Sequence, residues 1–584
     1  MRYRACEHPA QLTLMHSGVE KSNGDSTMNK PLYWLAAAFL LMLAVLLNMG
    51  VLSAGWRWDD PSILLHAHQF SIIQDVLDPA VWQQFSPANL TPLLILSLEI
   101  DLILAGLSPW FFYLHQLILL AAAAFLLFVL LRLWCDTRFA IAGAILFLCG
   151  LPVMTVAEQL MTRHYAEGLV LALISIYGVV RYLRTGSLAV LVLAILSYGL
   201  AVMAKEVYVP LPALLLCLPE STWRKRLLAS APFFAVLAVY ALWRSWMLPS
   251  LTGGYVDSAS YFSLAFIQQV IATYLSFPRL LSGAIWPLFL TGYLGLLVFY
   301  LWKKRAAVVT SDRAVAAVWP LFSVLVAALV LAPLAPLVQS PGIVQADRYL
   351  FALWAALSFS MAFFAGRFAD RQSSRWSLPL LGGLVILSLL HALPQRQAMA
   401  AVGQAFDVQG EFIWQQVDTV AYQPSPEVLP VLWFVNGLAD LKSGISNGTS
   451  PVVVVDDLYL AKAQGKPLFA YDPQCHCMRD QSADAELRRQ QLTASLRPQA
   501  PLSVRFEYRQ RTVNWQFGPY TDGSYQLVSD RIGVIPAPPQ GQMRALLAED
   551  AGFYVRYQSP EGWQSYSEEF RIQHDGPVID WVRE

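Results

Sequence analysis

Charged residues are scarce in this chain of 584 residues and make up only 14% of the sequence. Ordinary globular proteins carry roughly a quarter of charged residues. Hydrophobic residues make up 56%, so the chain lacks the polar surface of a soluble globule. The scarcity of charge therefore predicts a polytopic membrane protein. Basic and acidic residues number 40 each, and this balance gives no sign of nucleic-acid binding, so we expect no nucleic-acid partner.

Cysteine is also sparse, with six residues in the whole chain. Cys475 and Cys477 form a C-x-C pair, which is too close for an easy disulfide and too small for a structural zinc site. We interpret them as two thiols or an irregular bridge, with a metal site as the weaker alternative. The other four lie in or beside apolar segments, where a free thiol behaves as a small hydrophobe: Cys6, Cys135, Cys149 and Cys217.

The sequence shows no cleavable signal peptide. Its first apolar run, residues 31–54, is too long for the apolar part of such a signal, and no small-residue cleavage site follows. We interpret the run as a signal anchor. The polar residues before it include Arg2, Arg4, Lys21 and Lys30, which predict a cytoplasmic N-terminal tail at 1–31.

Long apolar runs dominate the first two thirds of the chain. Two runs, 89–107 and 262–283, carry central polar or charged residues that are costly in a span, and we interpret both as interfacial helices on the outer surface. A transmembrane helix needs about 20 mainly apolar residues. Eleven runs are predicted to be spans: 32–54, 110–131, 139–157, 168–183, 187–203, 206–219, 229–247, 285–302, 315–337, 349–366 and 377–394.

Loop charges set the orientation. With this assignment every inner loop is basic, as in the short loop 220–226, whereas the outer loops hold Asp59, Asp60, Asp75 and Asp78. This satisfies the rule that basic loops remain in the cytoplasm. The sequence thus predicts a transmembrane catalytic domain at 32–394, with a first outer loop at 55–109 and everything after 394 outside.

The last part of the chain, 395–584, changes character. It is rich in Gln, Pro, Asp and Gly, and it contains short alternating segments separated by turn residues. We expect a soluble β-rich domain that is entered through a few helical turns near 397–417. A β-sandwich is one arrangement that such strands can form. The predicted strands lie in PVVVVDD, SVRFEYRQ, TVNWQFGPY, GSYQLVSD, GFYVRYQ and SYSEEFRIQ.

Polar groups gather at the outer junctions of the predicted spans. Charged residues at helix ends often only extend toward the interface. Their occurrence on one side suggests instead an outer cavity in which carboxylates face cations suited to a phosphate. The candidate residues are Asp59 and Asp60 after the first span, Arg163, His164 and Glu167, then Lys205, and finally Asp347, Arg348 and Tyr349.

These junctions resemble the GT-C glycosyltransferases, multi-span enzymes that use polyprenyl-phosphate sugars. WRWDDPSILLHA resembles the acidic first-loop motif of that class. LRLWCDTRFAIAGAILFL and GLAVMAKEVYVPLPALLL are similar to segments of aminoarabinose transferases, the second around a lysine that contacts the donor phosphate. QADRYLFALWAA resembles the acidic-Arg-Tyr motif of O-mannosyltransferase-like members. The resemblance covers roughly residues 32–394.

The resemblance implies inverting transfer of a hexosyl or pentosyl group from a polyprenyl-phosphate sugar to an acceptor hydroxyl. Asp59 is the expected general base, and Asp60 is expected to bind a metal or orient the acceptor, although the two could exchange roles. Lys205, Arg348 and Arg163 are assigned to the donor phosphate, while Arg163 could instead hold Glu167. Glu167 is the second acidic position, with Glu158 as its competitor. His164, Tyr349 and Asp347 are supporting residues.

Several alternatives stay open at this stage. A divalent ion (Mg²⁺, Mn²⁺ or Zn²⁺) is a conceivable cofactor, and the acceptor can be a protein, a glycolipid or a polysaccharide. The charge pattern fits a bacterial inner membrane with a cytoplasmic N-terminus and a periplasmic C-terminal domain. The main rival is a lipid or glycan flippase or transporter, although such proteins place charges near the membrane midplane. A glycan ligase using a lipid-diphosphate donor is a further alternative.

Overall fold

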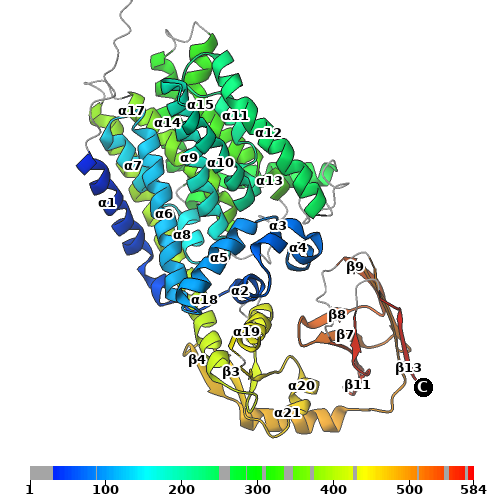
Figure 1. The fold of residues 1–584 in the computed structure, drawn as a ribbon. Helices are drawn as coiled ribbons and strands as arrows, with labels where there is room; N and C mark the ends of the chain where they lie inside the picture. Colours follow the sequence, from blue (N-terminus) through cyan, green and yellow to red (C-terminus); the bar gives the residue numbers. More distant parts are fainter. Residues whose placement is uncertain are drawn as a thin grey trace, which may run out of the picture.

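The computed structural model consists of a helical bundle with a mixed outer part at one end (Figure 1). Most of the predicted N-terminal tail, and Cys6 with it, lies outside the described residues. The structure describes residues 30–86, 88–248, 263–283, 286–304, 311–334, 346–368, 374–424, 431–446, 448–509, 512–544, 552–572 and 576–584.

The bundle is built from helices that follow the apolar runs of the sequence. They are α1 (Lys30–Asn48), α6 (Pro109–Leu131), α7 (Thr137–Leu148), α8 (Leu151–Ala157), α9 (Arg163–Thr185), α10 (Leu188–Ala204), α11 (Leu211–Leu216), α12 (Trp223–Met247), α13 (Leu264–Ser282), α14 (Trp286–Lys304), α15 (Ser311–Leu329), α17 (Phe351–Phe368) and α18 (Ser374–Gln415).

The prediction of a polytopic helical membrane protein is confirmed, but the count of eleven spans is not reproduced. Within the described ranges, six helices are long and apolar enough to cross a membrane. A bent pair formed by α7 and α8 makes a seventh, with an angle of 57° between its halves. The other predicted spans correspond to apolar helices of 10–17 residues, such as Leu188–Ala204 and Glu206–Leu216.

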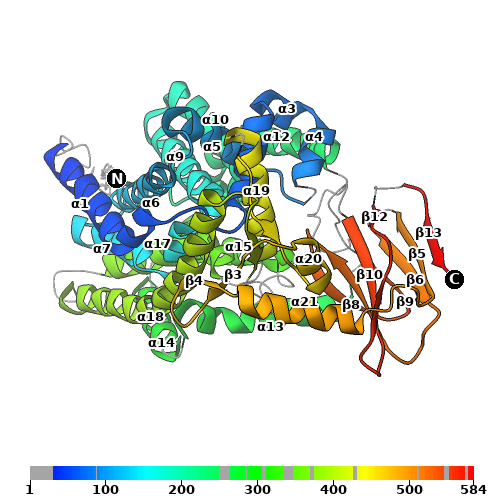
Figure 2. The ribbon, with the colours of Figure 1, turned by 90° about the horizontal axis from the view of Figure 1, so that it is seen from below.

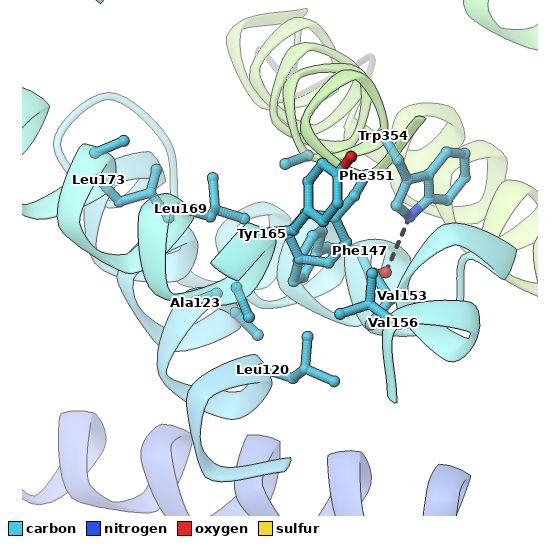
Figure 3. Close-up of a cluster of buried hydrophobic side chains, with 14 of the residues drawn as sticks. Leu120, Ala123, Phe147, Val153, Val156, Tyr165, Leu169, Leu173, Phe351 and Trp354 are labelled. Carbon is cyan, nitrogen blue, oxygen red and sulfur yellow. Dashed lines mark hydrogen bonds between the residues drawn. The ribbon is translucent and has the colours of Figure 1, made fainter. Parts of the chain in front are cut away.

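A cluster of aromatic side chains packs at the bend between α7 and α8. Gly150 lies at the break, where an added Cβ would come within 1.9 Å of Trp354 Nε1. Only glycine leaves room for that ring. Trp354 Nε1 donates to the carbonyl of Phe147, and Tyr165 lies next to Phe351 in the same cluster (Figure 3). This core packs α9, which carries Arg163, His164 and Glu167, against α17, which closely follows Asp347, Arg348 and Tyr349.

The first outer loop folds into four short helices at the outer end of the bundle. They are α2 (Asp60–Gln69), α3 (Ile72–Leu77), α4 (Pro79–Phe85) and α5 (Pro92–Ala105). Helix α5 corresponds to the first predicted interfacial helix. Its 14 residues extend about 21 Å, which is short of the about 30 Å of a bilayer core. The length agrees with a helix that does not span.

Helix α18 connects the bundle to the outer part as one continuous helix of 42 residues (Figure 1). The expected few turns near 397–417 are therefore the end of a long helix. It is followed by a four-stranded sheet in the order β2-β1-β3-β4. The sheet and its helices comprise β1 (Ala421–Gln423), α19 (Val431–Ser446), β2 (Val452–Val453), α20 (Asp457–Lys462), β3 (Leu468–Asp472), β4 (Cys477–Asp480) and α21 (Ser482–Ser495).

Two further sheets pack face to face and form a sandwich, because one hydrophobic cluster draws on both. Val504 and Phe506 contribute from one sheet, and Phe553 and Val555 from the other. The sheets have the orders β13-β5-β6-β9 and β11-β10-β7-β8, with β12 beside β10. The strands are β5 (Leu502–Arg509), β6 (Thr512–Gly518), β7 (Ser524–Ser529), β8 (Gly533–Ala537), β9 (Gln540–Arg544), β10 (Gly552–Gln558), β11 (Gln564–Tyr566), β12 (Phe570–Arg571) and β13 (Ile579–Arg583).

Each predicted strand segment contains a strand, because alternating β-formers bury every second side chain. The sequence reasoning missed the helical content between 431 and 495, which makes the first half of this region mixed rather than β-rich. Cys475 and Cys477 form a disulfide in the turn between β3 and β4, so the irregular bridge is the correct alternative.

Candidate functional site

A polar cavity of about 590 Å³ lies where the first outer loop, the bundle and α19 meet. Its walls come from segments far apart in the sequence: α2, the start of α9, the short 3-10 helix Ala346–Leu350 before α17, the junction after α10, and α19. Figure 2 shows α9, α10, α17 and α19 in one view of the molecule. Of the predicted site residues, it gathers Asp59, His164, Lys205, Arg348 and Tyr349. A cavity at the predicted junctions therefore exists, with one carboxylate and two cations of the predicted set on its walls, whereas its location on the outer face stays a prediction.

The adjacent carboxylates Asp59 and Asp60 have different surroundings. Asp59 lies before the first turn of α2 and lines the cavity, and its side chain makes no capping hydrogen bond to the helix backbone. Asp60 is buried, and its two oxygens accept hydrogen bonds from the backbone N–H groups of Arg57, at 3.0 Å, and Met161, at 3.1 Å. Asp60 thus joins the loop to the start of α9 and leaves Asp59 to the cavity.

Burial alters the pKa of both carboxyls. It raises the pKa of Asp59, and the positive charge of Arg348 opposes that rise. It raises the pKa of Asp60 to about 7, against the hydrogen bond from the Arg57 N–H, and the charge of Asp59 adds to the rise. A carboxyl with a raised pKa is a better proton acceptor once it is ionised. The coupling to Arg348 also indicates that Asp59 faces the cationic wall.

Arg348 carries a partly buried guanidinium whose hydrogen-bond partners are neutral. Its Nη1 donates to Gln159 Oε1 at 3.1 Å, its Nη2 lies 3.4 Å from Tyr349 Oη, and the group lies over the Tyr349 ring. No carboxylate oxygen within the described ranges lies within 4.0 Å of it. A buried charge without a counterion is costly. The arrangement therefore favours an anionic ligand at this point of the cavity.

Lys205 lies across from Arg348 in the turn after α10 and is buried. Its ammonium is 3.3 Å from Asn89 Oδ1 and 3.7 Å from Glu206 Oε2. The other oxygen of Glu206 accepts a hydrogen bond from Arg244 at 2.6 Å. Charge-assisted hydrogen bonds are typically about 2.7–2.9 Å long, so the contacts of Lys205 are loose. A phosphate oxygen would give the ammonium a closer partner.

A second, largely apolar cavity of about 380 Å³ adjoins the first at Lys205. Lys205, Asn89, Tyr165 and Tyr349 line both cavities. The rest of the second cavity is lined mostly by apolar side chains of the bundle, among them Val207, Val209, Leu237, Val330, Pro333 and Leu334. A ligand with a phosphate and a hydrocarbon tail can place each part in the cavity that suits it.

Arg163 does not reach the polar cavity, contrary to its assignment to the donor phosphate. It is fully buried in α9, where its guanidinium pairs with Asp101 at 2.5 Å and donates to the carbonyl of Phe112 at 2.7 Å. His115 also contacts Asp101, at 2.8 Å. Because its donors are used inside the protein, Arg163 stabilises the packing of α5, α6 and α9 instead.

Glu167 also lies outside the cavity lining, one helical turn after Arg163 and buried. No hydrogen bond or ion pair within the described ranges joins Arg163 to Glu167, so the alternative in which Arg163 holds Glu167 stays a prediction. Its competitor Glu158 accepts a hydrogen bond from Arg57 at 2.7 Å. Asp347 precedes Arg348 and does not line the cavity, whereas His164 lines it and packs against Tyr165 at 4.7 Å.

Several residues that shape the site were missed by the sequence reasoning. Arg57 connects the first loop to Glu158 and to Asp407 of α18, each at 2.7 Å. His66 lines the cavity and contacts Asp75 at 2.7 Å. In the segment WRWDDPSILLHA, the sequence argument used only the two aspartates, although Arg57 stands in the same segment.

The predicted divalent metal finds no suitable ligand group. Within the described ranges, no three His, Cys, Asp or Glu side chains are grouped so that they could hold an ion. Asp60, the proposed ligand, has both oxygens engaged by backbone N–H groups. We therefore derive no step through a metal.

Comparison with known proteins gives only distant structural relatives. No protein-family model and no curated protein sequence matches the chain. Among solved structures, it is similar to ArnT from Cupriavidus metallidurans bound to undecaprenyl phosphate, with 15% identity, a TM-score of 0.33, and coverage of 77% of this chain and 93% of that one.

The chain is also similar to the archaeal oligosaccharyltransferase AglB from Archaeoglobus fulgidus, solved in complex with an inhibitory peptide and a dolichol-phosphate. The identity is 11% and the TM-score 0.38, with coverage of 88% of this chain and 75% of that one. Because both TM-scores are below 0.5, no residue here takes its role from these structures.

Proposed function

We propose that this protein is an integral-membrane glycosyltransferase of EC 2.4 type that moves a sugar from a polyprenyl-phosphate donor to an acceptor hydroxyl with inversion. The observation that carries the proposal is the pair of cations, Lys205 and Arg348, which line one cavity together with Asp59. Arg348 has neutral hydrogen-bond partners, and Lys205 pairs only loosely with Glu206, at 3.7 Å. The resemblance of the surrounding segments to GT-C motifs supports the same reaction.

The two adjoining cavities suit the donor. The phosphate occupies the junction, where the charges of Lys205 and Arg348 offset its negative charge. The polyprenyl chain follows the apolar cavity into the bundle, and the sugar extends into the polar cavity toward Asp59. This placement keeps the hydrocarbon away from water and exposes the anomeric carbon on the polar side.

The chemistry then needs one base and one stabilised leaving group. The acceptor oxygen attacks the anomeric carbon and forms the new glycosidic bond, while the bond between that carbon and the phosphate oxygen breaks. Asp59 takes the hydroxyl proton. The electron pair of the broken bond remains on the phosphate, where Lys205 and Arg348 stabilise it. Asp60 positions Asp59 through its two backbone hydrogen bonds.

The site opens on the side of the outer part, because α19 forms one of its walls (Figure 1). With the basic loops of the sequence in the cytoplasm, this side is the outer face of the membrane. We propose a bacterial inner membrane, with the C-terminal region in the periplasm.

The proposal is tested with purified full-length protein and a radiolabelled polyprenyl-phosphate sugar, by following release of polyprenyl phosphate. Asp59→Asn is expected to lower the rate by about 10²–10⁴-fold with donor binding retained, as for loss of a general base. Lys205→Ala is expected to raise the donor KM about tenfold or more, because a charged hydrogen bond is lost.

Two exposed residues provide matched controls, Asp484→Asn and Lys225→Ala, both of which should behave as wild type. Normal turnover by Asp59→Asn would remove Asp59 as the base. A wild-type protein that moves the intact donor across vesicles without releasing its sugar would instead be a flippase. Turnover only with a lipid-diphosphate donor would identify a glycan ligase.

A further inference from the structure

Part of the polar cavity is not used by the donor in the proposed reaction. Beyond Asp59, one face of α2 continues along the wall and contributes Ser62, His66 and Gln69. These positions follow helical spacing, so their side chains share one face. Gln69 lies ten positions after Asp59, and at a rise of 1.5 Å per residue this face extends about 15 Å away from the base.

The facing wall is α19, which contributes Trp433 and Asp440. The two helices lie close together, because an added Cβ at Gly437 would come within 2.5 Å of Ser62 Oγ. Gly444 approaches Leu65 in the same way, so α19 and α2 run in the same direction. This register places Trp433 toward the Asp59 end of α2. Trp433 is 51% exposed, so its ring is available to a ligand in the cavity.

His66 is held in a defined orientation on the α2 wall. Its Nε2 lies 2.7 Å from Oδ1 of Asp75, which is fully buried, and its ring stacks on Phe85 at 4.3 Å between centroids. The carboxylate accepts a hydrogen bond from Nε2–H, and in that neutral tautomer Nδ1 is a hydrogen-bond acceptor. The imidazole is thus preorganised to accept a hydrogen bond from a ligand hydroxyl.

We propose that Ser62, His66, Gln69, Trp433 and Asp440 form the acceptor subsite, and that the acceptor is a saccharide. This inference rests on the proposed glycosyl transfer and names its second substrate class. Hydroxyl, amide, imidazole and carboxylate groups match the many donors and acceptors of sugar hydroxyls. An aromatic ring with an apolar face packs against the C–H face of a sugar ring.

The lining favours a saccharide over the other acceptors. The described cavity lining has only two cations, Lys205 and Arg348, and the donor phosphate takes both. An acidic acceptor would therefore meet the carboxylates of Asp59 and Asp440, because Arg531, which pairs with Asp440, does not line the cavity. A hydrocarbon acceptor would need a continuous apolar wall, whereas on the wall between α2 and α19 the apolar Ile63 and Leu65 are interrupted by a hydroxyl, an imidazole, an amide and a carboxylate.

The sandwich is connected to this subsite. Asp440 pairs with Arg531, in the turn between β7 and β8, at 2.8 Å. Asn436 of α19 donates to the carbonyl of Asp530 in the same turn at 3.0 Å. The sandwich therefore helps to hold α19 at the cavity wall. Through α19, the sandwich takes part in the proposed acceptor selection.

Binding of methyl glycosides and short neutral oligosaccharides to the full-length protein tests the subsite, measured by saturation-transfer NMR. Serine-containing tripeptides are the comparison probes. We expect saturation transfer to sugar ring protons, and Trp433→Ala should weaken it about tenfold, as for truncation of a central aromatic in a binding site. Trp223→Ala is the matched control, because Trp223 is 53% exposed on α12 and lies outside the cavity lining.

Gln69→Ala is the second variant, for the case in which Trp433→Ala does not fold. Equal binding by wild type and both variants, or binding of the tripeptides alone, would overturn the saccharide subsite. Release of polyprenyl phosphate from the donor distinguishes the two proposals. If that release persists while no saccharide binds, the acceptor inference fails and the glycosyltransferase proposal stands.

Discussion

At the scale of the residue, chemically similar cations have different roles because their surroundings give them different partners. Lys205 and Arg348 face a cavity with loose or neutral partners, whereas Arg163 is enclosed with Asp101 at 2.5 Å. Buried ion pairs like the second are chiefly structural, because removing one partner leaves an unpaired charge. Arg348 instead has neutral hydrogen-bond partners and Lys205 a loose ion pair with Glu206 at 3.7 Å, so a phosphate would give both a closer anionic partner.

The environment of Asp59 predicts a specific pH dependence. Asp59 must be ionised to accept a proton, so activity should rise as the pH increases through its pKa. Burial raises that pKa above its ordinary value of about 4, and Arg348 opposes the rise. Arg348→Gln should therefore move the acid limb of the kcat–pH profile, measured at saturating donor, to higher pH. Arg348→Lys keeps the charge and should leave the limb near its wild-type position; an unmoved limb in Arg348→Gln would contradict the coupling.

The structural role of Arg163 predicts a loss of stability. Arg163→Ala leaves the carboxylate of Asp101 buried without its partner, which should cost about 3–5 kcal/mol in the free energy of unfolding. Thermal unfolding in detergent measures the effect as a lowered Tm.

A double variant separates this role from donor binding. Arg163→Met with Asp101→Leu removes both charges and should restore most of the stability and with it the transfer rate. If the double variant folds but shows a raised donor KM, Arg163 binds the donor after all.

At the scale of the element, close approach between helices builds the acceptor side of the cavity. Gly437 brings α19 against α2, and the pair of contacts from Arg57 to Glu158 and Asp407 holds the first loop to α8 and α18. Figure 1 shows α2 and α19 next to each other at the outer end of the bundle. The cavity therefore depends on segments separated by more than 300 residues in the chain.

Separating these helices should impair transfer. Gly437→Val places a branched side chain where the first carbon alone would lie 2.5 Å from Ser62 Oγ. We expect a cost of about 1–3 kcal/mol in stability and a higher acceptor KM with an unchanged donor KM. Ala439→Val, on the same helix but away from the cavity lining, is the control. An equal loss in both variants would show that the effect is not specific to the contact with α2.

At the scale of the whole molecule, the site lies at the boundary between bundle and outer part, and α18 makes the two parts continuous. The disulfide between Cys475 and Cys477 belongs to the outer part. Disulfides form and persist in oxidising compartments, so its presence agrees with an outer location.

Thiol labelling tests this orientation. In intact cells treated with a reductant, a membrane-impermeant maleimide should label Cys475 and Cys477, which lie in a turn at the surface of the outer part. A Lys225→Cys variant carries an exposed thiol in the basic first turn of α12. Without reductant, so that Cys475 and Cys477 stay paired, it should be labelled only after the cells are permeabilised. Labelling of Lys225→Cys in intact cells would reverse the topology.

The sequence by itself determined the membrane class, most strands of the sandwich (but not β8, β9 and β13) and five of the cavity residues. These features depend on local composition, because apolar length, alternation and helix-end charges are visible in short windows. Asp59, Lys205 and Arg348 each stand at such a junction.

Only the tertiary structure decided which charges meet. Arg163 and Lys205 occupy similar positions along the chain, and their partners are set by packing across helices: Asp101 of α5 for one, and the cavity for the other. The same holds for α19, whose glycine contact with α2 spans hundreds of residues. Long-range contacts depend on how whole helices pack, so no local pattern in the sequence reveals that α19 covers the site.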